Sequence, residues 1–170
     1  MSQVVEVSRH DEALPSDSEP MEPTFRVRLA VGPVNGVESA VKLLSSPQEL
    51  PRLHPLIEKV DVQSCKRDGP REVTDFTIDE RLPILGGLVK VSNRYRGRCM
   101  RDDSHPGVLR LSGWSSPGVR IEVRYEITPA QIVETLWLAA PWWAGSFVFK
   151  TALKAHRRTL EAVLSVTSPR

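Results

Sequence analysis

Residues 132–166 read IVETLWLAAPWWAGSFVFKTALKAHRRTLEAVLSV, and this stretch decides the fold. Its first eight residues have the composition of a strand, and Pro141, Trp142 and Trp143 follow that strand. From Phe149 onward, apolar side chains recur with the 3.6-residue spacing of a helix that lies on a core. A strand that leads into one long amphipathic helix predicts a sheet closed by a C-terminal helix, and this arrangement favours an internal pocket over a solid core.

One polar side chain interrupts the apolar stripe of this helix. The stripe consists of Phe149, Ala152, Leu153, His156, Leu160, Val163 and Leu164. Leucine would pack better than His156, and an imidazole buried there needs a hydrogen-bond partner and titrates near neutrality. His156 is therefore either a core histidine bonded to one acceptor or a functional group in a pocket, with Glu80 or Asn93 as its expected partner.

Length and charge indicate one domain with a charged N-terminal extension. The chain has 170 residues and is 40% hydrophobic, enough to bury a core in a single domain. Residues 1–23 hold six acidic side chains against Arg9, a net charge of −5, which leaves about +7 of the total of +2 for the remainder. We expect residues 1–23 to be a mostly disordered acidic tail, apart from a short added strand within residues 1–7, and residues 24–168 to form the domain.

Period-two alternation and turn residues mark the remaining strands. The first strand is expected at Phe25–Val31, and two short helices should follow, one capped by Asn35 and one at 47–53. Six further strands are expected near residues 57–65, 72–82, 88–101, 108–114, 119–128 and 132–139. The predicted class is α+β: a seven-stranded curved antiparallel sheet that grips a long C-terminal helix, with two short helices between the first and second strands.

This order of elements resembles the START-like or Bet v 1-like helix-grip (SRPBCC) superfamily, nearest to its small polyketide cyclase/dehydrase-type members. Four short segments carry the local likeness: SPQEL at 46–50, LHP at 53–55, SPGVR at 116–120 and AHRRTL at 155–160. The resemblance covers residues 24–168. It implies a cavity between sheet and helix that holds a lipid, sterol, polyketide or quinone-like molecule, with the protein acting as carrier or sensor. A cyclase or dehydratase that uses the same cavity, and a protein-interaction module with a filled core, are the alternatives.

Applied to these strands, the resemblance implies a set of ligand-binding residues. They are Phe76, Ile78, Glu80, Val91, Asn93, Tyr95, Leu109, Leu111, Val123, Tyr125, Phe149, Leu153 and His156. His54, Trp142 and Trp143 are expected at the mouth of the pocket or as its lid, although burial of the tryptophan pair between the last strand and the helix is also open. Apolar side chains at this period fill cores more often than they contact ligands, so each residue taken singly could be core.

Several other classes of function find no support in the sequence. No catalytic motif is present, so binding without catalysis is favoured, and no cofactor or metal is expected because the histidines lack ligand spacing. Cys65 and Cys99 are expected to be free thiols. The basic residues between Lys90 and Arg101 lack interleaved aromatics, which argues against nucleic acid, and Glu122 and Glu126 are their expected ion-pair partners. The longest uncharged run is too short to span a bilayer, so we expect a cytoplasmic protein with at most transient contact at a membrane surface.

Overall fold

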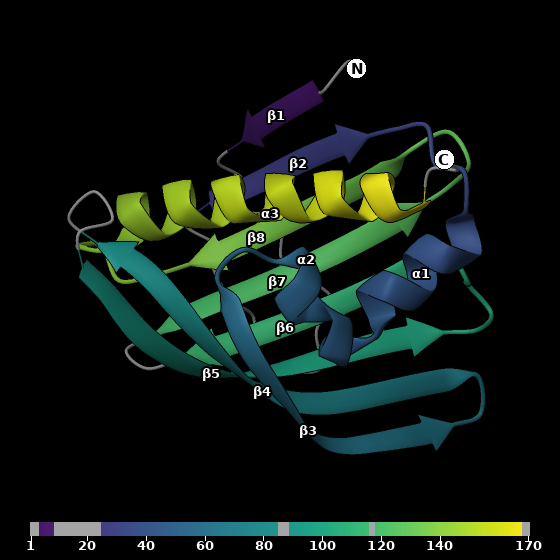
Figure 1. Cartoon of the computed structure of the whole chain (residues 1–170), viewed down its shortest axis with the longest axis horizontal. Helices are drawn as coiled ribbons and strands as arrows, with labels where there is room; N and C mark the ends of the chain where they lie inside the picture. Colours follow the sequence, from purple (N-terminus) through teal and green to yellow (C-terminus); the bar gives the residue numbers. More distant parts are fainter. Residues whose placement is uncertain (1–3, 9–24, 85–88, 116–117, 168–170) are drawn as a thin grey trace.

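A single antiparallel sheet forms one layer of the molecule, and all the helices lie on one of its faces (Figure 1). The computed structural model describes residues 4–8, 25–84, 89–115 and 118–167. The spatial order of the strands is β1-β2-β8-β7-β6-β5-β4-β3. Their bounds are β1 Val4–Ser8, β2 Phe25–Val31, β3 Ile57–Asp68, β4 Arg71–Ile84, β5 Val89–Asp102, β6 Val108–Ser115, β7 Val119–Ile127 and β8 Ile132–Ala139.

The predicted α+β architecture is confirmed, and the strand count rises from seven to eight. The additional strand, β1, comes from the acidic tail and pairs with β2 at the sheet edge, where Val4 lies opposite Ala30. This is the short added strand that the sequence allowed, and tail residues 9–23 lie outside the described residues. The predicted β2 has the observed bounds, because its alternation matches a strand that is buried on one face.

Of the two helices between β2 and β3, the first begins one residue later than the cap pattern predicted, and the second has the predicted limits, 47–53. Helix α1 spans Val37–Ser45, and its N-cap is Gly36 without a side-chain hydrogen bond, so Asn35 was the wrong cap. The second predicted helix is a 3₁₀ turn, Pro47–Glu49, that continues into α2, Leu50–Leu53. Two prolines at early helical positions explain the short irregular start, since proline donates no backbone hydrogen bond.

Helix α3, Gly145–Thr167, crosses the sheet on the face that also carries α1 and α2 (Figure 1). Its C-terminal half is fully packed: Leu160 and Val163 have no exposed surface, and Leu164 is buried. These side chains join a core cluster with buried residues of β2, β7, β8 and α1. A second, smaller cluster around Phe76 and Ile78 includes Leu50 of α2, and no residue of α3 belongs to it.

Two glycines in neighbouring strands admit aromatic rings onto the inner face of the sheet. A Cβ at Gly97 would lie 2.3 Å from Phe76 Cε2, and one at Gly113 would lie 3.2 Å from Tyr95 Cε2. Because neither position carries a side chain, Phe76 and Tyr95 can lie flat across β5 and β6.

We expect Gly97→Ala to destabilise the fold by about 1–3 kcal/mol, because the added methyl group collides with the Phe76 ring. The matched control is Gly145→Ala, whose Cβ would meet Phe25 only at 3.4 Å. Urea unfolding of both variants and the wild type measures the difference. Equal stability of Gly97→Ala and the wild type would show that the Phe76 ring moves aside without cost.

Candidate functional site

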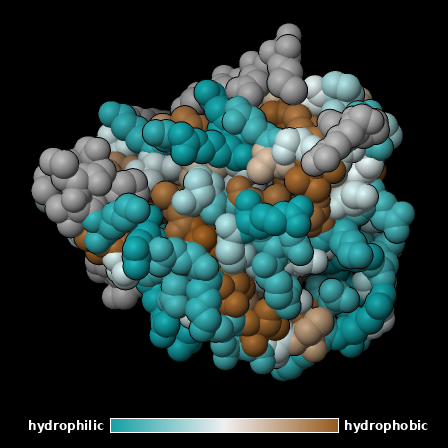
Figure 2. Space-filling model, in the orientation of Figure 1, coloured by the Kyte–Doolittle hydropathy of each residue, from teal (hydrophilic) through white to brown (hydrophobic). Residues whose placement is uncertain are grey.

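A cavity of about 130 Å³ lies between the sheet and the N-terminal half of α3. Its walls come from β3 to β7, from α2 and its following loop, and from α3. Figure 2 shows apolar side chains in the gap between α3 and the short helices, on a face that is otherwise mostly hydrophilic. One water needs roughly 10–15 Å³ of such space, so the cavity is about an order of magnitude larger than a single water site.

Most of the predicted ligand-binding residues meet in this cavity. Those that line it are Phe76, Ile78, Glu80, Asn93, Tyr95, Leu111, Val123, Tyr125 and His156, together with His54, which was predicted at the mouth. They come from four neighbouring strands, the loop after α2, and α3. The prediction of which side chains face inward along each strand was correct for these residues, because side chains alternate between the two faces of a strand.

The other predicted residues lie elsewhere. Leu109 is fully buried in the core cluster, whereas Val91 is 44% exposed. Phe149 stacks on Phe25 with ring centroids 4.6 Å apart, and together with Leu153 it packs on the outer side of the same cluster. Ala152 and His156 of the predicted stripe do line the cavity, and on α3 they are joined there by Phe147, Val148, Thr151 and Thr159, which were not predicted.

His156 is paired with an acid that the sequence analysis did not select. Its Nδ1 contacts Oε1 of Glu134 on β8, a residue with no exposed surface, and Glu80 and Asn93 are not its hydrogen-bond partners. Burial by itself lowers the pKa of His156, but the adjacent Glu134 carboxylate, aided by Glu80, outweighs burial and raises it above its ordinary value. The contact fixes the ring, with Nδ1 committed to Glu134.

Tyr125 faces the same carboxylate from the neighbouring strand. It lies directly opposite Glu134 in the β7–β8 register. Burial first, and then the charge of Glu134, raise the pKa of the Tyr125 hydroxyl well above its ordinary value, so this phenol stays neutral. The second carboxylate oxygen, Glu134 Oε2, has no hydrogen-bond partner among the described residues.

His54 lies against His156 and is left incompletely bonded. The two imidazole rings meet edge to face with centroids 5.6 Å apart. His54 is 8% exposed, and its Nδ1 has no hydrogen-bond partner in the part of the chain that the structure describes. Burial, and then the charge of His156, lower the pKa of His54 to about 3, so the ring is neutral at physiological pH.

A second polar group occupies the β4–β5 wall of the cavity. Glu80 accepts hydrogen bonds from Asn93 Nδ2 at 3.5 Å and from the Tyr95 hydroxyl at 3.4 Å. Burial raises the pKa of Glu80 against the effect of those bonds and of His156. An apolar cavity with two small polar groups is the usual composition of a site for a small molecule.

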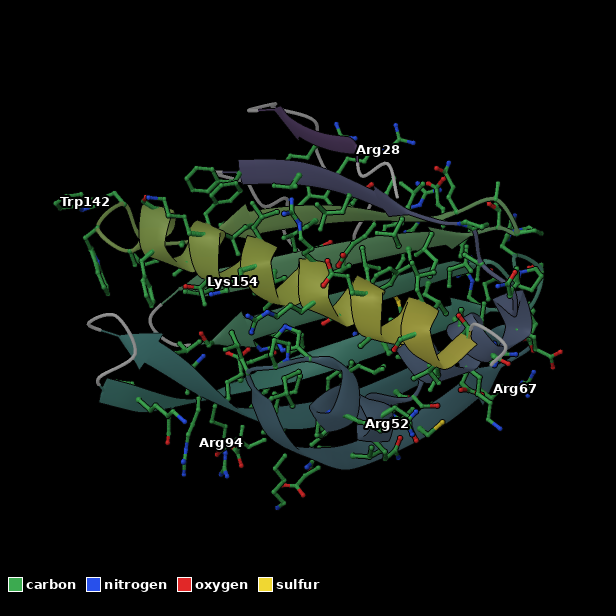
Figure 3. The ribbon with its side chains drawn as sticks, turned by 45° about the horizontal axis from the view of Figure 1, so that its top comes forward. Arg28, Arg52, Arg67, Arg94, Trp142 and Lys154 are labelled. Atoms are coloured by element: carbon green, nitrogen blue, oxygen red, sulfur yellow. The ribbon has the colours of Figure 1, made fainter. Side chains whose placement is uncertain are left out.

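The tryptophan pair at the start of α3 is exposed, so the alternative of a buried plug is wrong. Trp142 is 93% exposed and Trp143 is 65% exposed, and neither lines the cavity. Figure 3 shows Trp142 pointing away from the body of the protein. The hydrogen bond from the Ala144 N–H to the Pro141 carbonyl closes a turn at this point, and the turn holds both indoles outside the sheet.

Glu134 was missed, although a signal was available. It is the one acid in β8, and in the inward phase it follows Ile132 and precedes Leu136. A carboxylate in a strand that is buried on both faces needs a charged or hydrogen-bonding partner, and the one titratable residue on the apolar stripe of α3 is His156. Pairing the two exceptions would have predicted the contact.

The basic strand is an ion-paired surface, as expected, but its partners differ from the prediction. Arg94 pairs with Asp79 and Arg98 with Asp75, both across the β4–β5 ladder. The predicted partners, Glu122 and Glu126, lie on β7, two strands away from β5, whereas β4 is adjacent. Solvent-exposed pairs of this kind add little to stability.

Three other expectations concern cysteines, metals and membranes. Cys65 and Cys99 are free thiols. Within the described ranges, no cluster of three or more histidine, cysteine, aspartate or glutamate side chains could hold a metal ion. Nor does any helix described here have the length and apolar character needed to cross a membrane.

The two buried histidines should give opposite contributions to stability as pH changes. The pKa of His54 is lowered to about 3 from 6.5, so its contribution is present above pH 6.5 and is lost as pH falls toward 3. The pKa of His156 is raised, so its contribution is complete below pH 6.5 and is lost as pH rises through the folded value. Replacing His54 should therefore remove a specific acid sensitivity.

We expect His54→Phe to flatten the loss of stability between about pH 6.5 and about pH 4.5 by up to about 1.4 kcal/mol per pH unit. Urea unfolding across this range measures the slope. His105→Phe is the control, because the His105 side chain is 72% exposed. The same slope in the wild type and His54→Phe would mean that His54 is protonated in the folded protein.

Comparison with known proteins identifies the fold. No protein-family model and no curated protein matches the chain significantly. Among solved structures, TTHA0849 from Thermus thermophilus is similar at 20% identity and a TM-score of 0.57, over 84% of this chain and 98% of that one. The Zhui aromatase/cyclase from Streptomyces sp. R1128 is similar at 16% identity and a TM-score of 0.54, over 84% and 92%.

A lipid-transfer protein has the same arrangement. The STAR-related lipid transfer protein from Xanthomonas axonopodis is 12% identical with a TM-score of 0.52, over 94% of this chain and 98% of that fragment. These identities are too low to transfer an activity, but the agreement in topology extends over almost the whole domain. The chain therefore has the START-like, Bet v 1-like helix-grip fold.

Proposed function

We propose that this protein binds a small hydrophobic ligand in the cavity beneath α3, as a carrier or sensor. The observation that carries the proposal is the cavity itself, about 130 Å³ in volume and lined mostly by apolar side chains from five strands and two helices. A protein that needed only a stable core would fill this space, since empty apolar volume costs stability.

Two further observations support this proposal over a protein-interaction module with a filled core. The cavity has room for more than a few waters, whereas a filled core would not. Proteins with the same fold include an aromatase/cyclase and a lipid-transfer protein, and the second of these is named for the transfer of lipids. Cytoplasmic residence, the domain limits at residues 24 and 168, and transient membrane contact remain predictions.

Filling the cavity from the helix side tests the proposal. We expect Thr151→Trp, on the wall formed by α3, to reduce binding of a neutral fluorescent probe, N-phenyl-1-naphthylamine, at least about tenfold. Lys154→Trp is the matched control, because it places the same indole on the exposed face of the same helix. Absence of probe binding to the wild type, or equal binding by both variants, would count against a ligand in this cavity.

One observation favours a second candidate, an acid–base enzyme of the cyclase or dehydratase type. His156 lines the cavity with its Nδ1 held by a buried carboxylate, an arrangement that leaves Nε2 to exchange a proton with a bound molecule. Glu80 and Tyr95 on the opposite wall provide further acid–base groups.

If the enzyme candidate is right, His156→Gln should lower turnover of a poly-β-ketone substrate by about 10²–10⁴-fold without loss of the fold. Product analysis by mass spectrometry, with circular dichroism as the check on folding, measures this. Unchanged turnover in a folded variant, or no turnover by the wild type, would leave ligand binding as the function.

A further inference from the structure

The polar groups of the cavity carry information about the ligand, because their charges and unused hydrogen-bonding atoms are fixed by the fold. No lysine or arginine is among the described residues that line it. Figure 3 shows that Arg28, Arg67 and Arg94 lie at the rim of the molecule and point outward. A bound carboxylate or phosphate would therefore have no permanent cation inside the cavity.

The one cationic group within reach is already neutralised. His156 is in contact with the fully buried Glu134 carboxylate, so a protonated His156 belongs to an ion pair with no net charge. Glu80 lies on the opposite wall, where burial raises the pKa of its carboxyl, and the same desolvation would disfavour the negative charge of an anionic ligand. Together these groups select against anions.

Near His156, the cavity lining instead includes the neutral imidazole ring of His54, which has unused hydrogen-bonding capacity. Nδ1 of His54 is buried without a partner in the described structure, although the ring packs edge-on against His156 and lines the cavity. A buried polar atom left without a partner costs stability. Because Nδ1 is closed off from the cavity, a bound molecule meets this ring at its other nitrogen, Nε2, which bonds no residue that the structure describes. Among the lining residues that the structure describes, His54 is the one with a buried side-chain atom that lacks a hydrogen-bond partner.

A hydroxyl group is the chemical group that fits this corner best. A neutral imidazole has one donor and one acceptor nitrogen, and which is which depends on its tautomer. A ligand carbonyl can only accept and an ammonium can only donate, whereas a hydroxyl does both and can bond either tautomer. The same hydroxyl could also bond the free nitrogen of His156, since Nδ1 of that ring is taken by Glu134.

We infer that the ligand is an uncharged hydrophobic molecule that carries a hydroxyl group, a phenol or an alcohol, and that this hydroxyl binds at the His54–His156 corner of the cavity. The inference rests on the proposed function, because it names the class of ligand for the same cavity. It excludes fatty-acid anions and phospholipids as the principal ligands.

Three probes of one shape separate the possibilities. They are 2-naphthol, 2-methylnaphthalene and 2-naphthoate, which share one ring system and differ in a hydroxyl, a methyl or a carboxylate. Displacement of N-phenyl-1-naphthylamine near pH 7.5 measures the affinity of each. We expect 2-naphthol to bind about tenfold tighter than 2-methylnaphthalene, and 2-naphthoate to bind most weakly, since an unpaired buried charge is costly.

Variants of His54 test whether the preference for a hydroxyl group arises at the His54–His156 corner. His54→Phe should reduce the preference for 2-naphthol over 2-methylnaphthalene, while His105→Phe, on the exposed loop, should keep the wild-type difference. If His54→Phe fails to fold, His54→Asn replaces it and should reduce the preference for the hydroxyl. Thermal unfolding and circular dichroism identify which variants are folded.

The outcomes distinguish this inference from the proposed function. If the wild type binds N-phenyl-1-naphthylamine but 2-naphthol and 2-methylnaphthalene bind equally, ligand binding stands and the hydroxyl preference is overturned. Tighter binding of 2-naphthoate also overturns it. If no probe binds, the proposed function fails. A hydroxyl preference that His54→Phe leaves unchanged overturns the assignment to the His54–His156 corner.

Discussion

The packing of one long helix across one sheet is the constraint on which the rest of this structure depends. The two halves of α3 are packed differently. In the C-terminal half, Leu160, Val163 and Leu164 fill the space between helix and sheet. In the N-terminal half, Phe147, Val148, Thr151 and Ala152 face the cavity and leave part of the gap between helix and sheet open. Because the C-terminal half holds α3 against the sheet, the N-terminal half can cover the cavity without filling it.

His156 lies at the junction of these two halves, and its contact with Glu134 connects α3 to β8. A buried ion pair contributes little net stability, because the cost of removing both charges from water offsets their attraction. Two apolar side chains of similar volume would hold the helix at least as well. Packing alone therefore does not explain why a histidine and a glutamate stand here, and the position of His156 on the cavity wall agrees with a role toward a bound molecule.

The cavity also depends on two glycines, which have no side chain to fill the space. At Gly97 and Gly113 the rings of Phe76 and Tyr95 can lie across the strands, so that aromatic rings cover the backbone on this wall of the cavity. At the start of α3, the exposed turn holds Trp142 and Trp143 outside the cavity instead of filling it. The same fold could be solid with larger residues at these positions, so the cavity is a property of particular side chains and not of the topology alone.

The sequence by itself determined the order of elements, the strand limits to within a few residues and ten of the 26 residues of the cavity wall, because alternation and helical periodicity are local and strong. Phe76, Ile78, Tyr95, Leu111 and Val123 could be chosen from phase alone. Only the tertiary structure decided which side of the predicted stripe of α3 faces the cavity, which leaves Phe149 and Leu153 against the core cluster, and the pairing of His156 with Glu134. Those outcomes depend on which strands become neighbours. Position 134 on β8 and position 156 on α3 lie 22 residues apart, and although each is a polar exception in its own apolar pattern, only the packing of α3 over β8 decides that the two meet.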